Sequence, residues 1–227
     1  MSVYSPVIFL ILKMMFNKKK YISVLLLLIS VLAFSQSSIK FSHKTISRPE
    51  KWWAFFHPFI AKKAYKLTLK ARETAKVVAK DSVLDHDENG GQVDAFRHSY
   101  WMALLSQKIK PKKAFKLGKA HEMGNKLSFI KGDYEDGTQA DSLSSAMDIY
   151  NNAVGIEIGR ANKKVTEEEL KQLVIQSVLS GDMRILKKDK QGNYLDCNGN
   201  KIDLVLYSRK WSVPKCLIGS IKYQFAN

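Results

Sequence analysis

The chain has 227 residues, of which 45% are hydrophobic and 26% are charged. This composition is typical of a globular protein with a packed core, and it excludes a mainly disordered chain. The formal net charge of +16 favours anionic surroundings such as lipid head groups, cell-wall polymers or nucleic acid. A solvated, lysine-rich surface is the simpler interpretation. We expect no specific nucleic-acid partner, because the lysines are spread along the chain without an Arg cluster.

The first 35 residues have the three parts of a cleavable signal peptide. Residues 17–20 carry three lysines, and residues 21–34 form an apolar run that is too short for the ~20 residues of a membrane-spanning helix. Ala33 and Ser35 then provide small residues before Gln36. The sequence therefore predicts an exported protein, in the periplasm or the medium, whose mature chain begins near Gln36.

The signal peptide also suggests where the chain starts. Met14 or Met15 would place the lysine-rich segment at its usual terminal position, so either is a candidate for the true start. After the signal peptide, residues 36–50 are expected to form a flexible lead-in. Beyond residue 35 the chain keeps 33 basic and 21 acidic residues, a formal charge of +12.

The mature chain then shows helical periodicity. An aromatic cluster at residues 52–59 includes Pro58, which is favourable in the first turn of a helix. Thr166 and Glu169 form a capping-box pattern, and Gly181 is a natural residue to follow a helix. Apolar residues recur at helical spacing in five segments, at about 59–80, 93–108, 111–127, 142–159 and 166–181.

The last part of the chain changes period. Residues 184–186 and 202–207 are typical of strands, with turn signals at residues 192–193 and 198–199 between them. We therefore predict a mainly α protein. A single helical domain of about five helices would cover residues 51–183, and a small β element with one hairpin would cover residues 184–227.

The chain contains two cysteines, Cys197 and Cys216. In an exported protein, an even pair most simply forms one disulfide. Two buried free thiols are the alternative. Neither Cys has a His neighbour in the sequence, which argues against a Cys nucleophile.

A polar stripe marks the second expected helix. Asp94, Arg97, His98 and Trp101 lie at offsets 0, 3, 4 and 7, which puts them on one face. Burying Asp, Arg and His together is costly unless each is paired. Asp94 could orient His98 by accepting from one ring nitrogen, which would leave the other as ligand or base.

The third and fourth expected helices carry further polar groups. His121 and Glu122 are adjacent in the third, and Asp148, Asn151 and Asn152 share a face of the fourth. Asp and Asn are poor helix formers, so their position inside a helix suggests a tertiary role.

Two glycines follow these residues in the fourth helix. Gly155 and Gly159 lie four residues apart, and they would let a neighbouring helix approach closely.

Three motifs occur in order: Asp94–Trp101, Ala120-His121-Glu122 and Met147–Gly155. They resemble the A-x-R-H-x-x-W, A-H-E and M-D-x-x-N-N-x-x-G motifs of an uncharacterised bacterial family of helical domains found in exported proteins and at the C-termini of some toxins. The resemblance covers about residues 60–185. It implies a shared fold and polar centre, with no reaction attached. The spacing is also loosely similar to that of helical zinc phospholipases, but their fuller set of histidine ligands is absent.

Two interpretations of the polar centre remain open. His98, His121, Glu122 and Asp148 could form a metal or acid–base site, with Asp94, Arg97, Trp101, Asn151 and Asn152 in support. Two His and carboxylates from separate helices could hold Zn²⁺ with an open position, and a metal-bound water would make the domain a hydrolase. The substrate would be a lipid or another anionic envelope molecule. The alternative is a non-enzymatic envelope or interaction domain whose buried polar network is structural.

Calcium is the less favoured metal. Residues 85–90 match D-x-D-x-N-G, the first half of a calcium loop, but Phe96 occupies the twelfth position, where an EF-hand needs Glu. A looser calcium site and an Asx-rich turn before a helix are the alternatives, of which we favour the turn.

Overall fold

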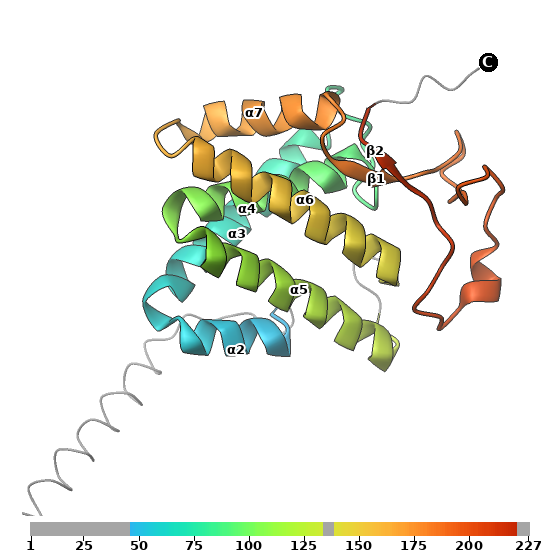
Figure 1. Cartoon of the computed structure of the whole chain (residues 1–227), viewed down its shortest axis with the longest axis horizontal. Helices are drawn as coiled ribbons and strands as arrows, with labels where there is room; N and C mark the ends of the chain where they lie inside the picture. Colours follow the sequence, from blue (N-terminus) through green and yellow to red (C-terminus); the bar gives the residue numbers. More distant parts are fainter. Residues whose placement is uncertain (1–45, 134–138, 222–227) are drawn as a thin grey trace, which may run out of the picture. The chain divides into compact units, whose positions relative to one another are not determined.

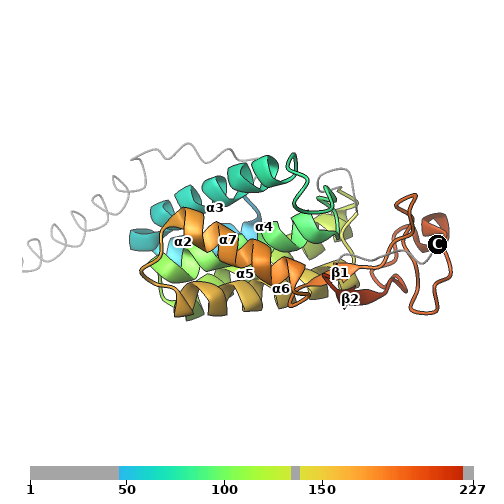
Figure 2. The same cartoon turned by 90° about the horizontal axis from the view of Figure 1, so that it is seen from above.

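The computed structural model describes residues 46–133 and 139–221. The predicted signal peptide and most of the expected lead-in therefore lie outside the described residues. Six α-helices dominate the described part, and the periodicity predicts five of them (Figures 1 and 2). They are α2 (Arg48–Phe56), α3 (Pro58–Val78), α4 (Gln92–Lys108), α5 (Pro111–Lys131), α6 (Ser142–Ala161) and α7 (Glu167–Leu179). Among the described helices, none is both long enough and apolar enough to cross a membrane.

Helix α4 is the central element of the domain. It packs against α3, α5, α6 and α7, and in both views it lies among its neighbours (Figures 1 and 2). Of its residues, all but Arg97 and Lys108 are buried. A helix enclosed on every side has no solvent face for its polar residues. The Asp and His of α4 are therefore placed in the interior.

Two glycines bring α6 close to α4, as their spacing predicts. A Cβ atom on Gly155 would lie 2.1 Å from the carbonyl oxygen of Ser99, and one on Gly159 would lie 2.1 Å from that of Ala103. These distances leave no room for any side chain larger than hydrogen. The close approach places the polar residues of α6 directly against those of α4.

Helix α2 is the one described helix that the sequence pattern did not predict. Ser47 and Glu50 form a capping box at its start, within the last residues of the expected lead-in. The helix ends at Phe56, and Pro58 begins α3 after His57. On its inner face Trp53 is buried, and its indole donates a hydrogen bond of 3.1 Å to the carbonyl oxygen of Lys113.

The C-terminal segment contains a small antiparallel sheet. Strand β1 (Arg184–Leu186) pairs with β2 (Leu217–Gly219), with Ile185 opposite Ile218. The strand expected at residues 202–207 is wrong, because residues Leu204–Tyr207 form the 3₁₀ helix η1, which Asp203 caps through the amide of Val205. The apolar side chains of η1 are exposed, so alternation of apolar residues here does not reflect a buried sheet face.

A disulfide joins Cys197 to Cys216, just before β2. It closes the irregular segment that follows β1. The segment also contacts the helical part of the domain through Tyr194 and Lys215, which reach the polar centre described next.

Candidate functional site

Three ligand atoms converge between α4 and α6. Nε2 of His98 lies 3.5 Å from Oδ1 of Asp94, one turn earlier on α4, and 3.4 Å from Oδ1 of Asp148 on α6. Each of the three residues offers one ligand atom, and these atoms all lie within 4.8 Å of one another. The residues are deeply buried, with exposed fractions of 6% for Asp94, 3% for His98 and 7% for Asp148. Two carboxylates and an imidazole in this arrangement form a candidate metal site.

Asp94 also supports the local backbone. Its Oδ2 accepts a hydrogen bond of 2.7 Å from the amide of Gly90, which holds the preceding loop against the start of α4. Its Oδ1 accepts from the guanidinium of Arg97. The carboxylate is thus fixed in position on two sides, while Oδ1 still faces His98.

Burial lowers the pKa of the His98 imidazole well below its usual value. The positive charges of Arg97 and His121 act in the same direction, whereas a hydrogen bond with Asn152 opposes them. His98 is therefore neutral near pH 7. Neutral imidazole is the form in which histidine binds metal ions.

The structure pairs His121 with a residue from the unpredicted helix. Nδ1 of His121 lies 3.1 Å from Oε1 of Glu50 on α2, and the ring packs edge-on against Trp101, with centroids 5.3 Å apart. Burial raises the pKa of Glu50, but the hydrogen bond and charge of His121, with the hydrogen bonds of Ser47, outweigh it and lower the pKa to about 2. A carboxylate that orients a histidine is the arrangement of an acid–base dyad.

His121 also lies near the convergent group, which consists of Asp94, His98 and Asp148. Its ring centroid is 6.1 Å from that of His98. The structure therefore places His121 beside the three ligand atoms, while Asp94, expected as a supporting residue, is one of the three.

Glu122 lies outside this group too. It accepts a hydrogen bond from Ser145 Oγ at 2.8 Å, which links α5 to α6, and one from Asn125 Nδ2 at 3.3 Å within α5. Asn151 exchanges two hydrogen bonds with the backbone of Arg184, at 2.8 and 2.9 Å, and so holds β1 against α6. Trp101 donates to Thr68 Oγ1 at 2.8 Å. These residues position the helices that carry the site.

Two hollows meet at this centre, and Arg97, His98 and His121 line both of them. The first also contains the side chains of Glu50 and Arg72. The second is lined by Asp94 and Asp148 together with residues from the C-terminal segment. An opening beside three convergent ligand atoms would allow a small substrate to reach them.

The C-terminal wall of the second hollow is formed by Leu186, Tyr194 and Lys215. Nζ of Lys215 lies 2.6 Å from Asp141 Oδ2 and 3.8 Å from the centroid of the Tyr194 ring. Burial raises the pKa of the Tyr194 hydroxyl, as do the charges of Asp87, Asp141 and Asp94. Sequence reasoning did not identify Tyr194 or Lys215, because they belong to an irregular segment with no recognisable motif.

The loop at residues 85–90 uses its carboxylates for hydrogen bonds within the protein. Asp85 accepts from the amides of Gln92 and Val93, and so caps α4. Asp87 accepts from the amide of Asn89 and pairs with Lys188. Over the residues that the structure describes, Asp94, His98 and Asp148 form the only group of three candidate metal ligands. The geometry of the loop is that of the Asx-rich turn.

A search of curated proteins and a search of solved structures each found no match. One family model matches, over residues 51–182, a range that ends before β1 and contains the three convergent residues, His121 and Glu122. The match covers more than half of the chain. The chain therefore belongs to the family described as Domain of unknown function (DUF6973).

Proposed function

We propose that this domain binds a divalent metal ion, Zn²⁺ in preference to Ca²⁺, through Asp94, His98 and Asp148, and that it is a metal-dependent hydrolase. The observation that carries the proposal is the convergence of three buried ligand atoms within 4.8 Å. Two buried carboxylates at this separation repel each other, and a cation between them would relieve that repulsion. The mixed nitrogen and oxygen ligand set suits Zn²⁺, whereas Ca²⁺ takes six or more oxygen ligands.

A Zn²⁺ ion bound by Asp94, His98 and Asp148 would supply an activated water as the nucleophile near neutral pH. The chain offers His121 as the group that moves a proton in this reaction. Glu50 fixes the His121 ring through Nδ1, at 3.1 Å, and both His121 and His98 line the same hollows. A histidine held by a carboxylate in this way is suited to general acid–base work.

The charges around the second hollow favour an anionic substrate. Arg97 and Lys215 both line it, beside the candidate ligands. Guanidinium and ammonium groups that line a cleft attract phosphate or carboxylate groups. This feature supports a lipid or another anionic envelope molecule as the substrate class.

An envelope substrate requires export, which we propose from the pattern of residues 17–35. The lysines, the apolar run and the small residues before Gln36 support cleavage at that point. N-terminal sequencing of protein made with its own leader should begin at or near Gln36. An intact, membrane-held N-terminus would contradict the proposal.

A second candidate function is a non-enzymatic interaction domain whose polar centre holds the helices together. The observation in its favour is that Asp94 already accepts a hydrogen bond from the amide of Gly90 and pairs with Arg97. Such a network can specify helix packing without any reaction.

Metal analysis separates the two candidates. Wild-type protein purified without chelators should contain about one equivalent of metal per chain, as three converging ligands imply. Asp148→Asn should lose it, since the amide keeps the shape of the carboxylate but not its charge. Asp182→Asn, at an exposed position just after α7, is the matched control and should retain the metal.

Activity is tested on the same proteins. The wild type should hydrolyse phosphatidylglycerol in vesicles or a chromogenic phosphodiester, and EDTA should abolish this activity. A wild-type protein without metal or hydrolysis would favour the structural role.

A further inference from the structure

The outer face of α2 and the start of α3 carry four exposed aromatic side chains. Trp52 is 53% exposed, Phe55 70%, Phe56 68% and Phe59 92%. Trp52, Phe55 and Phe56 pack against one another, with ring centroids 5.3–5.8 Å apart. A soluble domain rarely leaves so many large aromatic rings together in water. We call these four residues the aromatic face.

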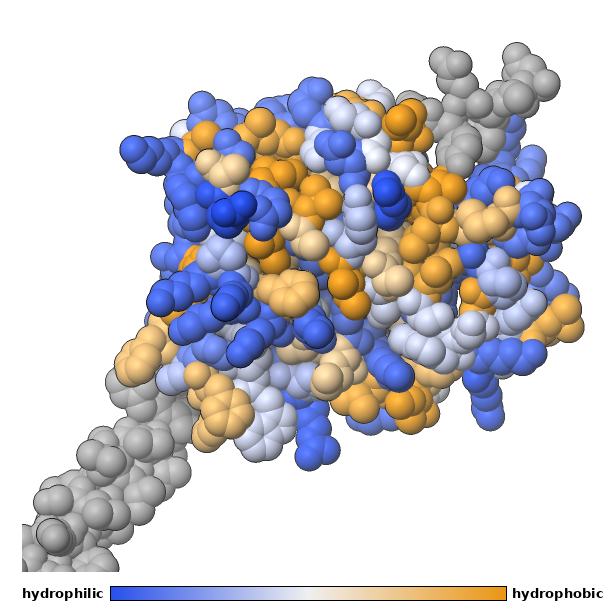
Figure 3. All heavy atoms as spheres, in the orientation of Figure 1, coloured by the Kyte–Doolittle hydropathy of each residue, from blue (hydrophilic) through white to orange (hydrophobic). Residues whose placement is uncertain are grey.

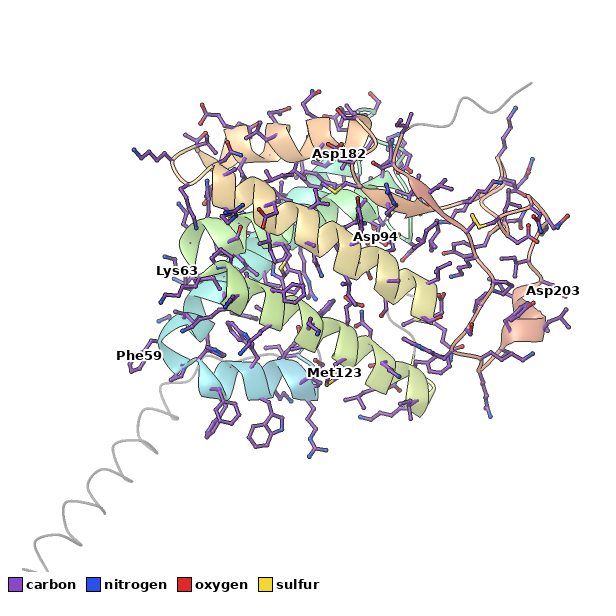
Figure 4. All side chains as sticks on the ribbon, in the orientation of Figure 1. Phe59, Lys63, Asp94, Met123, Asp182 and Asp203 are labelled. Atoms are coloured by element: carbon purple, nitrogen blue, oxygen red, sulfur yellow. A yellow bond between two sulfur atoms is a disulfide. The ribbon has the colours of Figure 1, made fainter. Side chains whose placement is uncertain are left out.

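The aromatic face projects away from the rest of the domain. Figure 4 shows Phe59 and Lys63 at the same end of the domain, where α2 leads into α3, and Met123 lies between α5 and α2. Figure 3 shows pale-orange hydrophobic rings at the α2 edge among blue hydrophilic atoms. A shallow groove continues from Trp52 towards α5, where Met123 and Leu127 line it. The exposed apolar surface thus extends over both helices.

The surroundings of the aromatic face are basic. Residues 51–72 and 106–121 contain no Asp or Glu. Exposed basic side chains occur along both segments, and Arg48, Lys116 and Lys119 line the groove itself. The remaining exposed lysines near the face are Lys51, Lys62, Lys63 and Lys66. Aromatic side chains surrounded by lysines suit the surface of an anionic membrane. The aromatic side chains suit the boundary of the acyl chains, and the lysines suit the phosphates of the head groups.

We propose that the aromatic face is a docking surface for an anionic lipid bilayer. Phe55, Phe56 and Phe59 enter the boundary between head groups and acyl chains, and Trp52 lies at the level of the head groups. The lysines pair with lipid phosphates, and their aliphatic stems extend along the apolar surface. The same charges disfavour a second copy of this chain as the occupant, because its own lysines would then face one another.

Docking through this face does not require the metal site. Helix α2 turns its aromatic residues outward, while Glu50 and Trp53 on its opposite side contact α5. The docked orientation therefore leaves the packing of the polar centre unchanged. Asp148→Asn should bind vesicles as the wild type does, so failure of one proposal leaves the other intact.

The test measures binding of the protein to lipid vesicles, by co-sedimentation and by the shift of its tryptophan emission. The wild type should bind phosphatidylglycerol-rich vesicles, with a blue shift of emission, and should bind pure phosphatidylcholine vesicles much more weakly. Phe56→Ser/Phe59→Ser should weaken binding by about tenfold or more, since two rings no longer leave water. Lys62→Glu/Lys63→Glu should weaken binding and reduce its dependence on salt.

The matched control is Val205→Ser/Leu206→Ser, which removes exposed apolar side chains from η1, where Val205 is 80% and Leu206 65% exposed. This variant should bind as the wild type does. All variants share the same residues before α2, so any contribution of that segment is common to them. Equal binding by the wild type and the Phe variant would overturn the proposal, as would equal binding to neutral and anionic vesicles. A wild-type dimer that the Phe substitutions dissociate would also overturn it, in favour of a second copy.

Discussion

Glu50 and His121 are 71 positions apart in the sequence, and Oε1 of Glu50 lies 3.1 Å from Nδ1 of His121. Through this pair, the short helix α2 is joined to α5 beside the convergent group of Asp94, His98 and Asp148. The same Glu50 also completes the capping box of α2 by accepting from the amide of Ser47 at 2.8 Å. One carboxylate therefore both starts a helix and orients a histidine.

The first prediction concerns Glu50→Gln. The pKa of Glu50 falls from 4.5 to about 2 in the folded protein. A lowered carboxyl pKa stabilises the fold at pH values above about 4.5, and this stabilisation is lost as the pH falls towards about 2. Glu50→Gln should lower the free energy of unfolding by about 2 kcal/mol near pH 6. The difference in this free energy between the variant and the wild type should shrink as the pH falls from 4.5 to about 2.

Urea unfolding at several pH values measures this effect. The exposed Glu73→Gln on α3 is the control and should show little change across the range. A difference between wild type and Glu50→Gln that stays constant from pH 6 down to acid would contradict the assigned pairing.

The second prediction concerns Gly155→Ala. By helix propensity alone, this change would stabilise α6 by about 1 kcal/mol. The added Cβ, however, would lie 2.1 Å from the carbonyl oxygen of Ser99 on α4, and backbone atoms cannot move aside without separating the helices. We expect a loss of about 3 kcal/mol or more, or a failure to fold.

Thermal unfolding checks the second prediction. Ala153→Gly, on the exposed face of the same helix, is the control and should cost only about 1 kcal/mol. A Gly155→Ala protein as stable as the wild type would show that α4 and α6 are not in such close contact.

The sequence predicted those features of the fold that depend on residues close together in the chain. The period of apolar residues located the five long helices to within a few residues, and the Thr166 and Glu169 pattern marked the start of α7. The glycine spacing on α6 predicted its close approach to α4. Helix α2 was missed because its apolar residues face outward: the periodicity that identifies a helix depends on a buried stripe, and α2 buries only Trp53.

The candidate site was predictable only in part. Asp94 and His98 are one helical turn apart, so their proximity follows from the sequence, but the third member of the group depends on how α6 packs. The pairing of His121 with Glu50 also could not be foreseen, because it requires a helix that the pattern did not reveal. The same holds for Tyr194 and Lys215, which tertiary contacts alone bring to the hollow.

The third prediction concerns the disulfide. Cys197 and Cys216 are 19 residues apart, and closing a loop of this size stabilises a fold by about 3 kcal/mol in the chain-entropy model. Thiol titration of denatured, unreduced protein should find no free thiol. Cys197→Ser/Cys216→Ser should lower the thermal midpoint while the helical circular dichroism persists. Two free thiols in the unreduced wild type would contradict the prediction.

The last prediction concerns His98→Ala and separates the two roles of the polar centre. If His98 is a metal ligand, its replacement should remove bound metal and hydrolysis while the helices keep their packing. If the group is structural, the change leaves Asp94 or Asp148 without its imidazole partner in the interior, and an unsatisfied buried polar group costs about 1–3 kcal/mol.

Metal content and thermal unfolding are measured on the same His98→Ala sample, with His86→Ala as the control. His86 is exposed, so its substitution should leave the metal content unchanged. Loss of metal with little change in the metal-free stability supports the ligand role. A markedly less stable His98→Ala protein, derived from a wild type that never held metal, would instead assign the group to helix packing, because the missing imidazole would then have acted only through its buried contacts.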